Sequence, residues 1–288
     1  MLLSVSSYSF QQYINAGKMT QFDCVAKAKE MGFEVIDFTE LEGKPDLEAQ
    51  KEYARKIRAE ADRLGMTIGA YTVGASLYYD NPADSETEIN RLKGQLDVAK
   101  ILGAPVMRHD VCWQLGKTGN SRSFDLMLPT IAANARAVTE YAETLGIKTC
   151  SENHGFIAQD SDRMERLYNT INHDNYGLLV DIGNFLCVDE DPVTAVSRVA
   201  PYAIHVHAKD MLVTSKPFGP SNILTRGCNY LTCTAIGEGN VPAEQCLRIL
   251  KRAGFDGIVA IEYEGRGDCI EGIAKGQKLL QKIFAELN

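Results

Sequence analysis

The feature that most constrains the fold is a junction that recurs along the chain: an amphipathic, helix-like segment ends at a glycine and an apolar, strand-like segment follows at once. Glycine just past a helix end takes the left-handed backbone conformation that other residues resist. The junction occurs five times, at Gly32, Gly65, Gly103, Gly146 and Gly254. Repeated passage from helix to strand predicts βα units and a parallel sheet.

The number of such units decides between the parallel folds. Strand-like runs are expected near residues 3–8, 34–38, 67–71, 105–108, 147–152, 176–181, 203–207 and 256–262. Eight strands alternating with eight helices favour a closed (β/α)8 TIM barrel of the α/β class over a doubly wound sheet. The first strand is not followed by a GxGxxG motif, which weakens the dinucleotide-binding alternative. We therefore predict one barrel domain spanning residues 1–288.

Four of the predicted strands, consecutive along the chain, end in an ionisable side chain: Glu152, Asp181, His207 and Glu262. The carboxyl ends of barrel strands meet at one mouth, where active sites are built. A buried carboxylate is costly unless it is paired or bound to a metal. Carboxylates with one imidazole suit a single divalent ion such as Mn²⁺, Mg²⁺, Co²⁺ or Zn²⁺, and the lack of Cys ligands argues against structural zinc. The alternative is four unrelated caps or ion pairs.

Charge and cysteine usage exclude several other classes of protein. The net charge is −8 and no basic block is present, so nucleic acid is not an expected partner. No apolar run is long enough to cross a membrane, and the N-terminus does not read as a secretion signal. The eight Cys form no CxxC motif and are expected to be reduced thiols. These observations predict a cytoplasmic protein without a membrane partner.

The sequence around the strand ends resembles a known family. The matching runs are SENHG (151–155), VDIGN (180–184), HVHAKD (205–210), IGEG (236–239) and IEYE (261–264). They are similar to the xylose-isomerase-like TIM-barrel superfamily, in its sugar phosphate isomerase/epimerase branch, which also holds ketose 3-epimerases, inosose dehydratases and endonuclease IV. The resemblance implies that Glu152, Asp181, His207 and Glu262 bind one divalent metal ion.

The chain departs from the family at three positions. Asn184 stands where the family often has His, three residues after the Asp of the sixth strand. Ketose 3-epimerases carry a second Glu and an Arg where this chain has Ala158 and Val213. The metal ligands are therefore expected to transfer to this chain, whereas the sugar-contacting positions are not.

Six further residues near the strand ends are candidates for contacting a substrate: His109, Trp113, His154, His205, Lys209 and Arg266. His205 shares the inward face of His207, but a hydrogen-bonded core histidine is an equal alternative. The alternative role for His109 is to take part in a salt-bridge cluster of a loop. The alternative role for Trp113 is to pack beneath a loop. Arg266 precedes the last helix and would hold a phosphate beside its N-terminus, unless it is a surface arginine.

The resemblance and the ligand set together predict a metal-dependent isomerase or epimerase of a small carbohydrate. Glu152 and Glu262 would flank the substrate as metal-bound acid and base in an enediolate mechanism. A dehydratase of the inosose type, on the same scaffold, is the main alternative. A nuclease related to endonuclease IV needs more histidines than this chain has, and a non-enzymatic sugar-binding barrel would bind no metal. The resemblance is also compatible with a homo-oligomer.

A long segment, residues 211–235, follows the seventh strand and carries several Gly and Pro, so it cannot be one helix. We expect an irregular segment that folds over the site as a partial lid, because excluding water favours enediolate chemistry. Arg226 or Lys216 would then approach an anionic group of the substrate. A surface loop or a subunit contact is the alternative.

Overall fold

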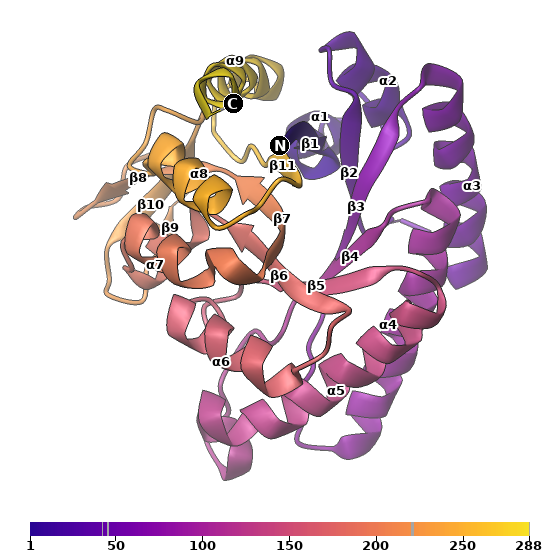
Figure 1. Ribbon diagram of the computed structural model, residues 1–288, viewed down its shortest axis with the longest axis vertical. Helices are drawn as coiled ribbons and strands as arrows, with labels where there is room; N and C mark the ends of the chain where they lie inside the picture. Colours follow the sequence, from indigo (N-terminus) through magenta and orange to yellow (C-terminus); the bar gives the residue numbers. More distant parts are fainter. Residues whose placement is uncertain (42, 45, 220–221, 288) are drawn as a thin grey trace.

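The computed structural model describes residues 1–41, 43–44, 46–219 and 222–287. Within these residues eight parallel strands close into a barrel, so the predicted (β/α)8 fold is confirmed (Figure 1). The barrel strands are β1 (Leu2–Ser6), β2 (Val35–Thr39), β3 (Thr67–Val73), β4 (Val106–His109), β5 (Lys148–Glu152), β6 (Tyr176–Asp181), β7 (Ala203–Ala208) and β11 (Ile258–Ile261). Each pairs with its neighbours in chain order, and β11 closes the ring against β1.

Helices alternate with the strands and cover the outside of the barrel (Figure 1). The α-helices are α1 (Gln11–Asn15), α2 (Asp23–Glu30), α3 (Leu47–Leu64), α4 (Pro82–Leu102), α5 (Phe124–Thr144), α6 (Ser161–Ile171), α7 (Pro192–Val199), α8 (Ala243–Arg252) and α9 (Cys269–Leu287). The described residues also form short 3₁₀ turns: η1 (Ser7–Phe10), η2 (Gly119–Arg122), η3 (Asn184–Val188) and η4 (Ala200–Tyr202). One face of each strand packs against the helices, and the other face points into the barrel interior. A strand such as β6 is therefore buried along its whole length.

The five glycine junctions have the backbone geometry that the sequence predicts. Gly32, Gly65, Gly103, Gly146 and Gly254 all have positive φ, between 63° and 95°. At α3 both ends are set locally: the Asp46 carboxylate accepts the backbone N–H of Ala49, and Gly65 ends the helix in the left-handed region. The repeated signature therefore marks where five of the barrel strands begin: β2, β3, β4, β5 and β11.

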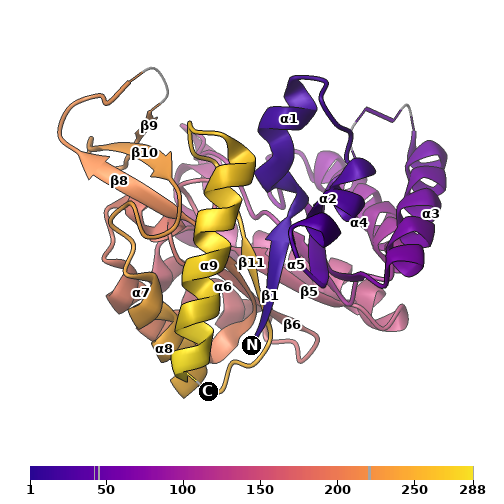
Figure 2. The same ribbon diagram turned by 90° about the horizontal axis from the view of Figure 1, so that it is seen from above.

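The segment after β7 is not the irregular segment that we expected. Its described residues form a three-stranded antiparallel sheet of β8 (Asp210–Thr214), β10 (Tyr230–Thr234) and β9 (Ile223–Leu224). The reason lies in its apolar and β-branched residues, which suit strands. Met211 and Leu231 pack with Cys187 in a small core of their own. Figure 2 shows this sheet at one side of the barrel, away from α2 and α3.

The expected lid is not seen over the barrel mouth. Among the described residues of 211–235, none lines the cavity at the mouth, and residues 220 and 221 lie outside the described part. Arg226 is held elsewhere, because its Nη1 donates to the Asp160 carboxylate at 3.0 Å and its Nη2 to the Phe156 carbonyl at 2.5 Å. Lys216 is exposed.

Across the described residues, no helix combines the length and the apolar character that crossing a membrane requires.

Candidate metal centre

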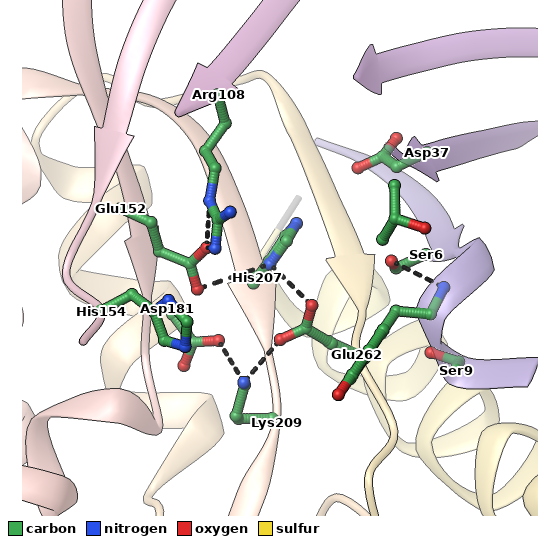
Figure 3. Close-up of polar contacts among 12 residues, drawn as sticks. Ser6, Ser9, Asp37, Arg108, Glu152, His154, Asp181, His207, Lys209 and Glu262 are labelled. Atoms are coloured by element: carbon green, nitrogen blue, oxygen red, sulfur yellow. Dashed lines mark hydrogen bonds and ion pairs between the residues drawn. The ribbon is translucent and has the colours of Figure 1, made fainter. Parts of the chain in front are cut away.

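Four side chains from adjacent strands meet at the carboxyl-terminal mouth of the barrel (Figure 3). Glu152 ends β5, Asp181 ends β6, His207 lies in β7 and Glu262 directly follows β11. One oxygen or nitrogen atom from each of the four side chains lies within 4.8 Å of the corresponding atoms of the other three. The structure therefore brings together the four residues that the strand ends singled out.

Asp181 has one oxygen held by the backbone and one that faces the cluster. Its Oδ1 accepts the N–H groups of Gly183 at 2.8 Å and of Asn184 at 2.9 Å. Its Oδ2 makes no hydrogen bond within the described residues and lies at ion-pair distance, 3.4 Å, from the Nζ of Lys209. Burial raises the pKa of Asp181 to about 6. The turn after β6 thus orients this carboxylate toward the centre of the cluster.

Glu152 is fixed by one donor from the neighbouring strand β4 and one from η3, the turn after β6. Its Oε2 accepts the Nε–H of Arg108 at 2.6 Å, and its Oε1 accepts the Nδ2–H of Asn184 at 3.0 Å. Asn184, which stands where the family often has His, therefore takes part in the site by supporting Glu152. Arg108 also lies 3.3 Å from Asp110, so one guanidinium links two buried carboxylates.

The imidazole of His207 lies between two of the carboxylates. Its Nδ1 is 3.5 Å from Glu262 Oε1 and 3.8 Å from Glu152 Oε1, and neither ring nitrogen has a hydrogen-bond partner among the described residues. Burial alone would lower the pKa of His207, but Glu262, Glu152 and Asp181 raise it to about 9. The three carboxylates around this imidazole create a negative potential that favours the binding of a cation.

Lys209 supplies positive charge at the edge of the cluster. Its Nζ lies 2.5 Å from Glu262 Oε2 and 2.7 Å from Glu264 Oε1. Burial alone would lower the pKa of Lys209, but Asp181, Glu262 and Glu264 hold it well above its usual value. Burial alone would raise the pKa of Glu262, but the positive charges of Lys209 and His207 outweigh the effect of burial and hold this pKa well below its usual value. Glu262 is therefore an ionised carboxylate at the cavity wall.

The residues present fit a divalent cation. Three carboxylates and one imidazole are the oxygen and nitrogen donors that Mn²⁺, Mg²⁺, Co²⁺ and Zn²⁺ accept. Buried polar atoms are almost always hydrogen-bonded, so a set without partners needs an explanation. Here Asp181 Oδ2 and both nitrogens of His207 are buried without a hydrogen bond in the described chain. A metal ion at the centre of the cluster would bind Asp181 Oδ2 and one of the two nitrogens of His207.

A cavity of about 320 Å³ opens directly above this cluster. Glu152 and Glu262 form its floor, and Arg108, Lys209 and His154 bring positive or ionisable nitrogen to its wall. Such a volume suits a small molecule, since ligand pockets begin at roughly 300 Å³.

His154 and Trp113, two of the predicted substrate contacts, stand together in the cavity wall. The Nδ1 of His154 lies 2.9 Å from Asp110 Oδ1, and its ring meets that of Trp113 edge-on, with centroids 5.0 Å apart. Burial alone would lower the pKa of His154, but the bond to Asp110 raises it. Trp113 is 51% exposed, so its ring is available to a ligand.

Three other predicted contacts do not line this cavity. His109 is buried on the outer face of β4, where its Nδ1 meets the Asp110 carbonyl at 3.0 Å. His205 is buried inside the barrel and pairs with Asp37. Arg266 donates from Nη2 to Thr232 Oγ1 at 3.3 Å, in a separate hollow beside the small sheet.

The N-terminus of α9 has its own acceptor. The Asp268 carboxylate accepts the backbone N–H groups of Ile270 and Glu271, at 2.9 and 3.2 Å. A phosphate placed there would meet a negative charge, so the phosphate site suggested for Arg266 has no support in this geometry.

Sequence reasoning chose His109 and missed its neighbour Arg108. The signal that could have found Arg108 is strand register. Arg108 pairs with Cys150, which shares its face with Glu152, whereas His109 pairs with the outward-facing Ser151. Because successive strand residues point to opposite faces, Arg108 faces the site and His109 faces the helices.

Comparison with known proteins supports the same fold. An inosose dehydratase of Lacticaseibacillus casei is 23% identical over 137 residues, which is 46% of this chain and 46% of that protein. The chain thus matches about half the length of such curated relatives. The crystal structure of D-psicose 3-epimerase from Clostridium cellulolyticum H10 with D-tagatose covers 100% of both chains with a TM-score of 0.74 and 14% identity.

A structure of the IOLI protein with a bound zinc atom covers 100% of this chain and 99% of its own, with a TM-score of 0.73 and 16% identity. The sequence model of one family matches residues 25–283. This chain belongs to the xylose isomerase-like TIM barrel family.

Proposed function

We propose that this protein is a divalent-metal-dependent isomerase or epimerase of a small sugar or sugar derivative, and that its reaction passes through an enediolate. The observation that carries the proposal is the cluster of Glu152, Asp181, His207 and Glu262: Asp181 and His207 hold buried atoms without a hydrogen bond, and Glu152 and Glu262 line a cavity of small-molecule size. The comparisons also support the proposal, because proteins of similar structure include the sugar epimerases D-psicose 3-epimerase and L-ribulose 3-epimerase.

The four residues of the cluster would hold the ion, which we expect to be Mn²⁺, Mg²⁺, Co²⁺ or Zn²⁺. When bound, it supplies positive charge that stabilises the oxygens of the sugar as the C–H beside the carbonyl loses its proton. Arg108 and Asn184 keep Glu152 in a fixed orientation, so the ligand set is organised before a substrate arrives.

Proton transfer is assigned to the two glutamates. Glu262, held ionised by Lys209 and His207, would take the proton from one face of the substrate. Glu152, from β5, would enter the step protonated and give its proton to the other face, which leaves Glu262 protonated and Glu152 ionised until both exchange protons with water. Lys209, at the cavity wall, would donate hydrogen bonds to the substrate oxygen that gains negative charge. His154 and Trp113 would contact the rest of the sugar.

A dehydratase remains a second candidate because of one specific arrangement. His154 lines the cavity and is held through Nδ1 by Asp110, which suits a group that protonates a departing hydroxyl. Inosose dehydratases are also among the curated relatives, at 23–26% identity. Both candidates begin with the same proton abstraction, and they differ in whether water is lost.

The test is a panel of ketoses, ketose phosphates and inososes, assayed in deuterated water with Mn²⁺, Mg²⁺ and Co²⁺. An isomerase or epimerase product keeps its oxygen count and gains deuterium beside the carbonyl, whereas a dehydratase product has lost water. The same panel is run on Glu262→Gln and on Glu244→Gln, an exposed acid on α8. Protein that binds no metal by elemental analysis, or that turns over substrates equally well as Glu262→Gln, would contradict the proposal.

A further inference from the structure

A second hollow adjoins the cavity above the candidate metal centre. Its volume is about 190 Å³, and it shares three lining residues with the cavity: Tyr8, Gln11 and Glu264. The two spaces therefore lie side by side and share part of their lining. A ligand anchored over the metal cluster would extend into the second hollow if it carried another group.

The second hollow lies between the first and last helices of the chain. Figure 2 shows α1 beside the N-terminal end of α9 at the same end of the barrel. Gln12 ties the two elements together, because its Nε2 donates to the Gly267 carbonyl at 3.2 Å and its Oε1 accepts the N–H of Cys269 at 3.0 Å. The walls of this hollow are thus fixed against each other by hydrogen bonds.

Three side-chain amides, those of Gln11, Gln12 and Asn15, line this hollow. Gln11 and Asn15 stand one turn apart on α1, and Gln11 Nε2 donates to Asn15 Oδ1 at 2.8 Å. An amide both donates and accepts hydrogen bonds, as the hydroxyls of a sugar do. Tyr8 stands in the shared wall with 38% of its surface exposed, and its hydroxyl makes no hydrogen bond within the described chain. Its ring and its hydroxyl are both available to a sugar.

The charge of this hollow excludes an anionic ligand. Its lining residues include no Lys, Arg or His. Its one acidic residue, Glu264, is already paired with Lys209 at 2.7 Å. A carboxylate or phosphate would find no counter-charge here, whereas an uncharged group rich in hydroxyls would find matching donors and acceptors.

We propose that the second hollow binds an uncharged, polyhydroxylated group joined to the reacting sugar, so that the substrate is a glycosylated ketose rather than a free monosaccharide. This inference rests on the proposed function for the identity of the reacting unit. It adds a subsite, formed by Tyr8, Gln11, Gln12 and Asn15, that selects for the attached group.

The test compares three probes on the Mn²⁺-loaded protein in deuterated water: D-fructose, and two disaccharides, lactulose and isomaltulose, in which a second sugar is attached to fructose away from its carbonyl. Deuterium uptake beside the carbonyl gives kcat/KM for each. We expect at least one disaccharide to exceed fructose by about tenfold, which a few neutral hydrogen bonds supply. Asn15→Leu should lower that ratio about three- to tenfold.

The matched control is Gln245→Leu, which removes an exposed amide from α8 and should leave the ratio as it is in the wild type. Turnover of fructose with no preference for either disaccharide, or a preference that Asn15→Leu does not alter, overturns the subsite and leaves the proposed function intact. If none of the three probes reacts, calorimetric titration decides: tighter binding of a disaccharide than of fructose, weakened by Asn15→Leu, supports the subsite, and equal binding overturns it. The reaction itself is then judged by the broader substrate panel.

Discussion

Two groups of buried carboxylate and imidazole side chains lie next to each other in this barrel. They differ in whether their polar atoms all have hydrogen-bond partners. The first group is the candidate metal centre of Glu152, Asp181, His207 and Glu262, called the metal cluster below, and the second group is the pair of Asp37 and His205. The rings of His205 and His207 meet edge-on with centroids 5.9 Å apart. The ligand atoms of Asp37, His205 and His207 also lie within 4.8 Å of one another, so proximity alone does not distinguish a metal site.

The interior pair is satisfied and closed. Asp37 Oδ1 accepts the hydroxyl of Ser4 at 3.0 Å, and Oδ2 lies 2.6 Å from His205 Nε2. Space for this carboxylate depends on Gly69, because a Cβ there would lie 2.6 Å from Asp37 Oδ1. The metal cluster, by contrast, keeps Asp181 Oδ2 without a hydrogen bond and opens into a cavity. Unpartnered atoms and an opening, rather than residue types, indicate where a ligand binds.

The largest effect is expected for Asp181→Asn. The amide keeps the size of the side chain but removes a negative charge that faces the ion, so metal content should fall and turnover should drop by about 10³-fold or more. Elemental analysis and the deuterium-uptake assay measure the two quantities. Asp162→Asn, an exposed acid on α6, is the control. A variant with full metal content and wild-type turnover would remove Asp181 from the site.

Asp37→Ala tests the opposite expectation for the interior pair. Removing one partner of a buried pair costs about 3 kcal/mol in the free energy of unfolding, since His205 and Ser4 lose their partner. Thermal and denaturant unfolding measure this loss, with Asp62→Ala on the surface of α3 as the control. Metal content per chain should stay that of the wild type. Loss of the metal without loss of stability would mean that Asp37 belongs to the metal site.

The effect of a chelator on the Tm is a third measurement that distinguishes the metal cluster from the pair of Asp37 and His205. An ion present at 100 times its Kd stabilises the folded state by about 2.7 kcal/mol, so a chelator should lower the Tm. We expect the same decrease in Asp37→Ala and none in Asp181→Asn. A chelator that leaves the Tm of the wild type unchanged would show that no ion is held by the folded chain.

The fold and the four strand-end residues follow from local sequence signals. The glycine junctions mark where strands begin, and a polar residue that ends an apolar run marks the mouth of the barrel. Arg108 was missed because the sequence of a short strand does not show which of its faces points inward. That face is set by the register with the neighbouring strand, in which Arg108 pairs with Cys150. His205 stayed ambiguous because its partner Asp37 is far away in the sequence.

The small sheet could not be predicted for a related reason. Glycine and proline in residues 211–235 indicated breaks in structure, whereas the antiparallel pairing of β8 with β10 depends on contacts across the intervening turn. The packing of Met211 and Leu231 against Cys187 completes it, and this contact joins two segments that sequence patterns treat separately.

The smallest effect is expected for Arg108→Met, which tests whether a residue beside the metal cluster contributes without binding the ion. Methionine keeps an apolar stem like that of arginine but lacks the guanidinium, so Glu152 and Asp110 lose the group that they share. Residues that orient a ligand typically contribute 10- to 100-fold, so kcat/KM should fall by about tenfold while the metal stays bound at saturating concentration. Arg55→Met, which removes an exposed arginine paired with Glu52 on α3, should have no such effect. Arg108→Lys should recover only part of the loss, because an ammonium group cannot reproduce the planar fork. A full recovery by lysine would show that Arg108 acts only through its charge, and unchanged kinetics in Arg108→Met would show that Glu152 needs no support from it.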